Sequence, residues 1–273
     1  MIRALFFGDV VGKSGRKILH KHLGELKKKY NCDFAIANGE NASGGLGITP
    51  DTAEEFFVMG IDVLTSGNHI WRHKEIYSYL DSKSEKIIRP LNYPSGQELA
   101  CSAPGLGYAV NKRNDVEIVV INIMGRTFVE PLDCPFRAMD LILKKFPLGN
   151  GRVIIVDFHA ETTSEKIAMG WHLDGRVSAI FGTHTHVQTA DERILQKGTA
   201  YITDAGMSGA MDTVLGVDKD IIVQRFLTQR PISFKFPEHT HDLGLNAVFV
   251  EIDETTGKAV SMERIFIRET KIN

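Results

Sequence analysis

Metal-capable side chains follow five short apolar runs of this sequence, each of the length expected for a buried strand. These side chains are Asp9, Glu40, Asn41, Asn68, His159, His184 and His186. Carboxylate, amide and imidazole groups without a thiolate form a donor set that suits iron, manganese or zinc. The residue types therefore indicate a metal centre built at the ends of strands.

The predicted strands are the elements that must position these groups. They cover residues 2–7, 33–38, 61–66, 152–158 and 177–181. In open α/β sheets ligands bind at the carboxyl ends of the strands, so we expect the five ends to converge on one site. A glycine next to the polar residue, as at Gly8 and Gly67, removes a side chain there and lets the backbone turn sharply.

Each candidate also has an ordinary structural interpretation. Asp9 alone could cap the helix that follows it, and Asn68 could belong to a turn. A single His159 is more often a core histidine than a ligand. His184 and His186 are more specific, because residues two apart in an extended segment point to the same side. The agreement of five strand ends favours the metal site.

The number of candidate ligands favours two metal ions over one. Seven side chains exceed the share of a single ion, whereas a carboxylate such as Glu40 can bridge a pair. Two ions about 3.5–4 Å apart generate a hydroxide and clamp a phosphoryl group for in-line displacement. Their charge lies where the pentacoordinate phosphorus gains negative charge. The pattern therefore points to phosphoester hydrolysis.

The order of these motifs resembles that of the calcineurin-like metallophosphoesterases, in particular the YmdB-type branch. The similar segments are GDVVG (8–12), NGEN (38–41), GNH (67–69), GRTF (125–128), DFHAE (157–161), GTHTHVQTAD (182–191) and AYITDAGMSG (200–209). The resemblance implies an α/β fold, a four-layer α/β/β/α sandwich of two mixed sheets flanked by helices. It also implies two metal ions, iron first with manganese or zinc as alternatives, and hydrolysis of phosphodiesters including cyclic nucleotides.

The resemblance also implies roles for single residues. One metal would be held by Asp9, Glu40 and His186, and the other by Glu40, Asn68, His159 and His184. Asn41 would be a ligand or a close neighbour, and His69 would protonate the leaving oxygen or steady the phosphate. Arg126 is a candidate to bind the substrate phosphate bidentately, or else forms a surface ion pair. Two departures from the wider superfamily affect the first metal: no histidine follows Asp9 closely, and the bridging residue is glutamate rather than aspartate.

The remaining pattern alternates strands and helices first and strands alone later. Helices are predicted over 15–30, from Thr49 as N-cap to Gly60, near 74–80 and over 135–146, and a further strand over 116–123. After Thr199 we expect only strands, over 200–203, 232–236, 247–252 and 260–267. This order predicts mixed sheets in one domain spanning 1–273.

Composition excludes several partners. The 273 residues carry a net charge of -2, which leaves no basic excess to hold a long nucleic acid. No apolar stretch approaches the about 20 residues of a membrane span, and the N-terminal apolar run is too short for a signal peptide. The three cysteines lack a CxxC spacing. We expect a cytoplasmic homo-oligomer, dimer or tetramer, in which exposed Trp71 and Phe128 belong to a subunit contact or a substrate rim.

The expected function is hydrolysis of cyclic nucleotides or small phosphodiesters by in-line attack of a metal-bridging hydroxide, with His69 and Glu40 as catalytic residues. Two alternatives remain open. One is a phosphomonoesterase or nuclease that uses the same site, and the other is a metal-binding regulatory protein with low turnover. The near-neutral charge disfavours action along nucleic acid duplexes, and the complete ligand set with His69 disfavours an inactive protein.

Overall fold

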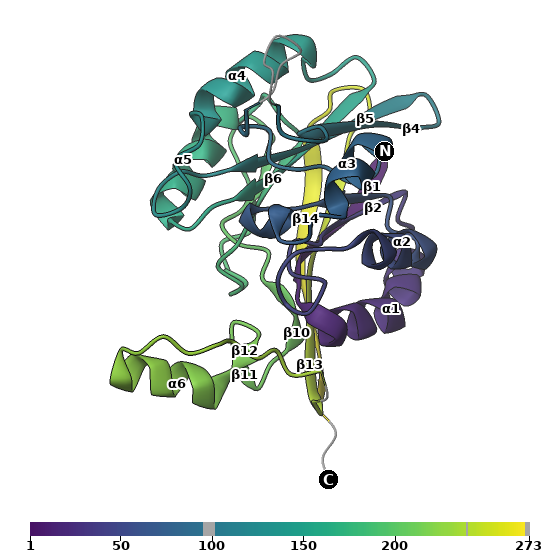
Figure 1. Cartoon of the computed structure of the whole chain (residues 1–273). Helices are drawn as coiled ribbons and strands as arrows, with labels where there is room; N and C mark the ends of the chain where they lie inside the picture. Colours follow the sequence, from purple (N-terminus) through teal and green to yellow (C-terminus); the bar gives the residue numbers. More distant parts are fainter. Residues whose placement is uncertain (95–101, 239, 271–273) are drawn as a thin grey trace.

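The computed structural model describes residues 1–94, 102–238 and 240–270. Two mixed sheets of six strands face each other, and helices cover their outer faces (Figure 1). The first sheet has the order β14-β13-β10-β1-β2-β3, with β1 Ile2–Val10, β2 Phe34–Asn38, β3 Val63–Thr65, β10 Met207–Ala210, β13 Asp242–Ile252 and β14 Ala259–Thr270. The second has the order β4-β5-β6-β7-β9-β8, with β4 Tyr108–Arg113, β5 Val116–Met124, β6 Arg152–His159, β7 Ala179–Thr183, β8 Arg193–Ile194 and β9 Ala200–Ile202.

The helices belong to two outer layers and to one projecting segment. The first sheet is covered by α1 Gly12–Lys29, α2 Pro50–Met59 and α3 Ile76–Ser82, the last preceded by the 3-10 turn Asn68–Trp71. The second is covered by α4 Pro135–Lys145 and α5 Thr163–Leu173. Residues 211–238, here called the arm, carry the hairpin β11 Thr213–Val214 and β12 Val217–Asp218 and the helix α6 Lys219–Thr228, and project from the body (Figure 1).

Three apolar cores separate the four layers. Along β1, Leu5 and Phe7 pack toward the helices, whereas Ala4 and Phe6 pack toward the second sheet. The strand therefore buries both faces, as the period of two along a strand requires. The second sheet alternates in the same way, since Ile155 of β6 enters the core between the sheets while its neighbours face α4 and α5. These cores confirm the predicted four-layer sandwich.

The helix α2 illustrates a correct local prediction. The Thr49 side chain accepts a hydrogen bond from the Thr52 backbone N–H, and Pro50 occupies the first turn. Gly60 ends the helix with φ 105, in the left-handed region that glycine enters without a steric penalty. Capping chemistry thus fixed both ends of this helix.

The prediction of strands alone after Thr199 is wrong. The helix α6 begins at Lys219, with the Asp218 side chain accepting hydrogen bonds from two backbone N–H groups of its first turn. Residues 232–236 form no strand either, although their apolar side chains alternate. Phe236 instead packs against Gly45, and Phe234 lines a groove of the arm beside α6. Alternation arises there from packing against two different neighbours and not from a sheet.

Two general expectations can be compared with the described part of the chain. Within residues 1–94, 102–238 and 240–270, no helix has the length and apolar content needed to cross a bilayer. Trp71 is half-buried and packs edge-on against Tyr77 and Tyr93, so the prediction that it is exposed is wrong. Phe128 is exposed as expected.

Candidate metal centre

The five predicted strand ends do meet, but they come from two sheets. In the first sheet, β1, β2 and β3 lead to Asp9, Glu40 and Asn68. In the second, β6 ends at His159, and His184 follows β7 directly. The sheets face each other, so their carboxyl-terminal edges enclose one site between them.

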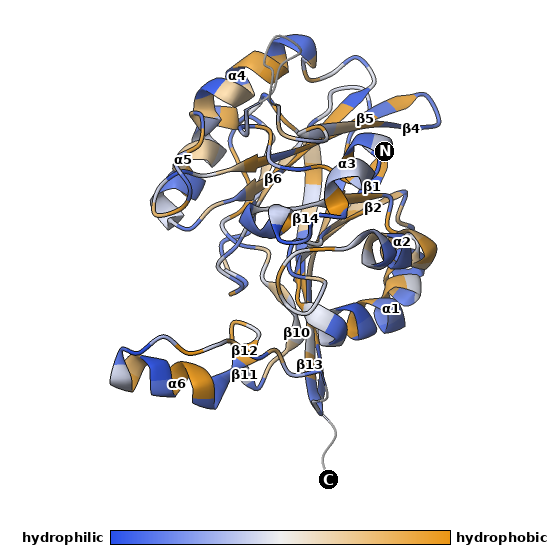
Figure 2. Cartoon of the chain, viewed as in Figure 1, coloured by the Kyte–Doolittle hydropathy of each residue, from blue (hydrophilic) through white to orange (hydrophobic). Residues whose placement is uncertain are grey.

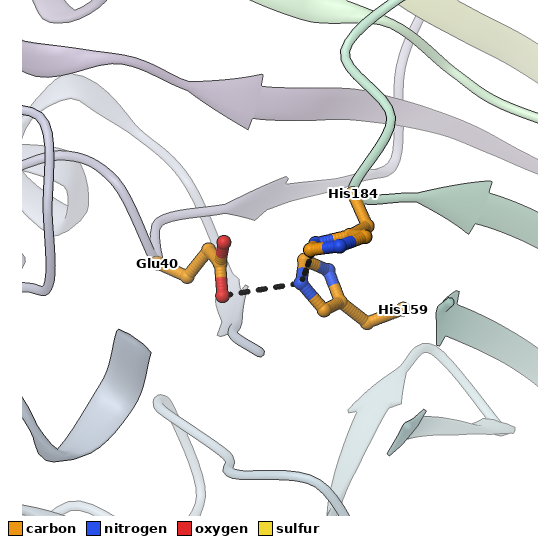
Figure 3. A group of neighbouring side chains, drawn as sticks. All are labelled: Glu40, His159 and His184. Carbon is orange, nitrogen blue, oxygen red and sulfur yellow. Dashed lines mark hydrogen bonds and ion pairs between the residues drawn. The ribbon is translucent and has the colours of Figure 1, made fainter. Parts of the chain in front are cut away.

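Four of these side chains form a close group that we call the compact half: Glu40, Asn68, His159 and His184. His159 Nε2 lies 3.2 Å from Glu40 Oε2 and 3.2 Å from Asn68 Oδ1. The Nδ1 atom of His184 lies 3.0 Å from the same nitrogen (Figure 3). Glu40, His159 and His184 offer ligand atoms that all lie within 4.8 Å of one another. A carboxylate oxygen, an amide oxygen and an imidazole nitrogen thus gather around His159 Nε2.

Asp9 and His186 form a looser group, the open half, beside the compact half. Asp9 Oδ1 lies 3.8 Å from His186 Nε2 and, although buried, finds no hydrogen-bond donor among the described residues. The Asn41 amide nitrogen lies 3.0 Å from Glu40 Oε1 and 3.2 Å from His186 Nε2, and so connects the two halves. A buried carboxylate oxygen without a partner is unfavourable, and a cation beside it would remove that penalty.

Hydrogen bonds on the far side of the His159 ring orient it toward the site. Thr183 Oγ1 donates to Asp157 Oδ1 at 2.7 Å and therefore accepts from His159 Nδ1 at 2.9 Å. Asp157 is held in turn by the Asn38 amide at 2.9 Å and by the Thr65 hydroxyl. The Nε2 atom of His159 is then left to hold either a proton or a metal ion against the carboxylate.

The other two histidines are oriented in the same way. His184 Nε2 lies 3.1 Å from the Glu161 carboxylate, which leaves Nδ1 to face the site. His186 Nδ1 donates to the Leu215 backbone carbonyl at 3.0 Å, which leaves Nε2 to face Asn41 and Asp9. Burial, together with the positive charge of His159, lowers the pKa of His184 to about 3, so this ring stays neutral. Metal-binding histidines are commonly fixed by such a hydrogen bond from the second ring nitrogen.

The electrostatics of the pocket favour one positive charge at its centre. Burial alone would lower the pKa of His159, but nearby carboxylates, of which Glu40 has the largest effect, raise it to about 9. Burial would likewise raise the pKa of Glu40, yet His159 and His69 hold it well below its usual range. Burial also raises the pKa of Asp9. Buried acids therefore hold a proton on His159, at a point where a metal ion could supply the same charge.

The glycines beside the candidate ligands are needed because other groups approach them closely. A Cβ at Gly67 would lie 2.2 Å from Glu40 Oε2 and 2.3 Å from His159 Nε2. Cβ atoms at Gly8 and Gly182 would lie 1.8 Å from backbone carbonyl oxygens. None of the three has a left-handed backbone, so close packing rather than a sharp turn explains them. Together with the donor set and the unpartnered Asp9 oxygen, the space kept at Gly67 shows that these residues fit a metal centre.

The expected geometry of the two neighbouring histidines is wrong. β7 ends at Thr183, and His184 and His186 have φ values of 95 and 63 rather than extended backbone. Non-glycine residues rarely adopt this left-handed region, and they persist there only where the surroundings impose it. Both side chains nevertheless reach the site, because the bent loop turns His184 toward His159 and His186 toward Asp9.

The remaining candidates lie at different distances from this centre. His69 Nδ1 lies 2.8 Å from Asn41 Oδ1 and 3.2 Å from Glu40 Oε1, directly beside the proposed ligands. Arg126 is exposed in the loop after β5, where its backbone N–H is 3.2 Å from the Glu165 carboxylate. Its role in substrate binding stays a prediction. His69 thus contacts the candidate ligands directly, whereas the contact of the Arg126 backbone is with Glu165.

Several supporting residues were not singled out from the sequence: Asp157, Thr183, Leu215, Lys166 and Asp204. Asp157 carries a recognisable signal, because it is an ionisable residue inside the apolar run of β6. Burial raises its pKa to about 6. Leu215 gives no signal, since it acts through its backbone carbonyl.

Known proteins share this fold and much of this sequence. A protein of Bacillus subtilis named 2',3'-cyclic-nucleotide 2'-phosphodiesterase is 46% identical over 272 residues, which cover 98% of each chain. A crystal structure described as a novel phosphatase of Mycoplasma pneumoniae has 37% identity and a TM-score of 0.90, covering 98% of this chain and 94% of that one. The calcineurin-like phosphoesterase YfkN of Bacillus subtilis shares only 11% identity, with a TM-score of 0.55 over 98% of this chain and 90% of its own, and shows the common fold.

The fold, the site and these relatives define a hydrolase that acts on phosphoesters. The chain belongs to the family described as YmdB-like protein, whose model matches residues 5–265. Glu40, His159 and His184 lie close enough to one another to hold a metal ion. The predicted family and fold are thereby confirmed.

Proposed function

We propose that this protein is a phosphodiesterase that hydrolyses cyclic nucleotides or small phosphodiesters at a centre of two metal ions. The convergence of three metal-capable side chains on His159 Nε2, at 3.0 to 3.2 Å, supports this proposal most strongly. The name of the Bacillus subtilis relative, identical at 46% of positions, supports the diester substrate.

The proposed ligands divide between the two halves. Glu40, Asn68, His159 and His184 would hold one ion, and Asp9 and His186, with Glu40 as the bridge, would hold the other. Bound ions would supply positive charge to the phosphoryl group and an activated water for in-line attack. The donor set without thiolate supports iron, with manganese or zinc as alternatives. Asn41 holds its position between the halves through Glu40 and His186.

His69 is the proposed general acid. Its Nδ1 atom faces Asn41 Oδ1 and Glu40 Oε1, both of which accept hydrogen bonds. A protonated ring would offer its Nε2–H to the leaving oxygen. Arg126 is the proposed partner of the substrate phosphate, because a guanidinium can bind two phosphate oxygens at once.

The setting we propose is a cytoplasmic homo-oligomer without a long nucleic acid partner. Cys32 and Cys134 are free, as is common in a reducing compartment, and Cys101 lies outside the described residues. Phe226 and Leu227 of α6 are 72% and 80% exposed, and Figure 2 shows apolar residues along this helix. Exposed large apolar side chains of this kind support a subunit contact.

Hydrolysis of matched aryl phosphates tests the proposal. Protein loaded with manganese or iron should hydrolyse a bis-aryl phosphate faster than the mono-aryl analogue, and a 2',3'-cyclic nucleotide faster than the corresponding monophosphate. Metal-depleted protein serves as the control and should recover activity when metal is returned. A preference for monoesters would favour the phosphatase alternative. Bound metal with hydrolysis of neither substrate would favour the regulatory protein.

A further inference from the structure

A buried ion pair lies directly behind the loop that carries His184 and His186. Lys166 of α5 is 1% exposed and Asp204, in the loop after β9, is 0% exposed. Lys166 Nζ lies 2.7 Å from Asp204 Oδ2. Neither residue belongs to the proposed ligands, and burying a lysine and a carboxylate is costly unless each is fully paired. The pair therefore requires a structural or functional reason.

The Asp204 carboxylate holds the residue between the two histidines. Its Oδ2 atom accepts hydrogen bonds from the Thr185 backbone N–H at 3.1 Å and from the Thr185 hydroxyl at 2.6 Å. Lys166 Nζ also donates a hydrogen bond to that hydroxyl, at 3.2 Å. Both flanking histidines have left-handed backbone, with φ values of 95 and 63. Fixing Thr185 from the main chain and the side chain opposes relaxation of this loop to an extended conformation.

The same carboxylate also reaches the open half of the metal centre. Asp204 Oδ1 accepts a hydrogen bond from the Gly206 backbone N–H at 2.8 Å, and the Gly206 carbonyl accepts one from the Asp9 backbone N–H at 3.0 Å. The next residue, Met207, donates its backbone N–H to the His186 carbonyl at 3.1 Å. One short turn thus links the ion pair to both residues of the open half.

The lysine is needed because the carboxylate lies among other acids. Asp204 acts on Asp9 as a neighbouring negative charge, as does Glu40. Three uncompensated carboxylates in one buried region would repel one another. Lys166 pairs with the one carboxylate that is not a proposed metal ligand, and Asp204 also accepts hydrogen bonds from Thr185 and Gly206.

We infer that Lys166 and Asp204 are positioning residues of the metal centre, which hold the loop 184–186 so that one histidine enters each half. The inference rests on the proposed function, because it assigns the role of the pair to metal binding. It concerns residues that touch neither substrate nor metal.

A double substitution separates positioning from folding. Lys166→Met with Asp204→Leu removes both charges and leaves neither unpaired, and such replacements are often neutral for stability. Metal-depleted protein is titrated with Mn²⁺ by calorimetry without substrate. We expect the Mn²⁺ affinity to fall about 10–100-fold, the usual range for groups that orient metal ligands. The thermal midpoint should fall, because the Thr185 and Gly206 N–H groups lose their acceptor, and kcat of the folded variant at saturating Mn²⁺ should recover in large part.

A second variant keeps the test decisive if the double substitution prevents folding. Thr185→Val removes only the hydroxyl and leaves the ion pair intact, and it should lower the Mn²⁺ affinity about three- to tenfold. The control is Arg152→Met with Glu117→Leu, a partly exposed ion pair at the amino end of β5 and β6, on the opposite edge of the same sheet. This control should bind Mn²⁺ as the wild type does.

The outcomes distinguish this inference from the proposed function. Wild-type Mn²⁺ affinity in the folded double variant, or in Thr185→Val if that alone folds, would overturn the positioning role. Loss of stability with unchanged affinity of the folded protein would also overturn it. If the wild type binds Mn²⁺ and cleaves diesters, and the variants bind Mn²⁺ with the same affinity, the positioning role is refuted and the proposed function stands. A wild-type protein that binds no Mn²⁺ would refute both.

Discussion

The two halves of the candidate metal centre are built differently. In the compact half, ligand atoms surround His159 Nε2 at 3.0 to 3.2 Å, and they project from the ends of β2, β3, β6 and β7. In the open half, Asp9 and His186 stay 3.8 Å apart. His186 lies in a loop and depends on the arm through the Leu215 carbonyl. Asp9 itself lies in β1, and His184 shares the loop of His186, so the closer spacing of the ligand atoms, and not their placement on strands, leads us to expect tighter metal binding in the compact half.

The residue Val11 explains part of this difference. The resemblance drawn from the sequence would place a histidine shortly after Asp9, and here Val11 stands there instead. Val11 is buried, and its Cγ1 would lie 2.7 Å from a Cβ at Gly216, in the turn that also carries Leu215. This position therefore supports the turn that orients His186 and contributes no ligand to the open half.

Removing the charge of Glu40, the proposed bridging ligand, should weaken both halves and lower turnover more than any other substitution proposed here. Glu40→Gln keeps the shape of the side chain but loses its charge, which both proposed ions share. Metal ions supply several kcal/mol to phosphoryl transfer, so we expect kcat to fall about 1000-fold. Turnover and metal content per chain are measured together, with Glu117→Gln at the far edge of the sheet as control. A fully active Glu40→Gln variant would refute the two-metal account.

Adding one methyl group should damage the compact half selectively. The new Cβ in Gly67→Ala would lie 2.2 Å from Glu40 Oε2 and 2.3 Å from His159 Nε2, so both ligands must move. Displacement by about 1 Å can lower turnover about 100-fold. The matched control is Gly24→Ala in α1, where a Cβ meets nothing within 4 Å; it should keep activity and gain about 0.5–1 kcal/mol of stability. Normal metal binding by Gly67→Ala would show that the compact half is not where we place it.

His69 should separate catalysis from metal binding. His69→Ala removes the proposed proton donor while all proposed ligands stay, and we expect kcat to fall about 100-fold with unchanged metal content. Steady-state kinetics and elemental analysis of the same preparation measure both quantities. If metal content falls with turnover, His69 is a ligand and not an acid.

The open half should respond most weakly and reversibly. His186→Ala removes one ligand of the looser ion, so turnover at low Mn²⁺ should fall about tenfold and recover as Mn²⁺ is raised. The activity is measured as a function of Mn²⁺ concentration, in parallel with His184→Ala in the compact half. An equal loss in both variants, with no recovery in either, would remove the difference between the halves.

Features that depend on residues close in the sequence, such as helix ends and the residues that follow strands, could be predicted. Thr49 and Gly60 define α2 by capping, and five strand ends with metal-capable residues indicated the site. Two helices escaped prediction. In α5 the glycine at 170 weakens the helical pattern and is required because the Tyr201 ring packs against it. In α6 Ile222 is buried but Val223, Phe226 and Leu227 are exposed, so the helix lacks a clear buried face.

The arrangement of the site was beyond reach because it depends on contacts distant in the chain. Nothing near His184 in sequence indicates left-handed backbone, which is fixed by Asp204 and Lys166 from other segments. The hydrogen bond from His186 to the Leu215 carbonyl is equally invisible, since any residue could supply it. The identities of the candidate ligands could be predicted, and most of the contacts that hold them could not.

Stepwise metal titration of the metal-depleted wild type, compared with His186→Ala, tests the unequal halves most directly. Calorimetry gives the number and affinity of the sites for Mn²⁺, and electron paramagnetic resonance reports whether two bound ions are coupled. We predict two binding steps of unequal affinity, with coupled ions at saturation, and a lower affinity of the weaker step alone in His186→Ala. A single equivalent of bound metal, two equal steps, or loss of the tighter step in His186→Ala would contradict the account.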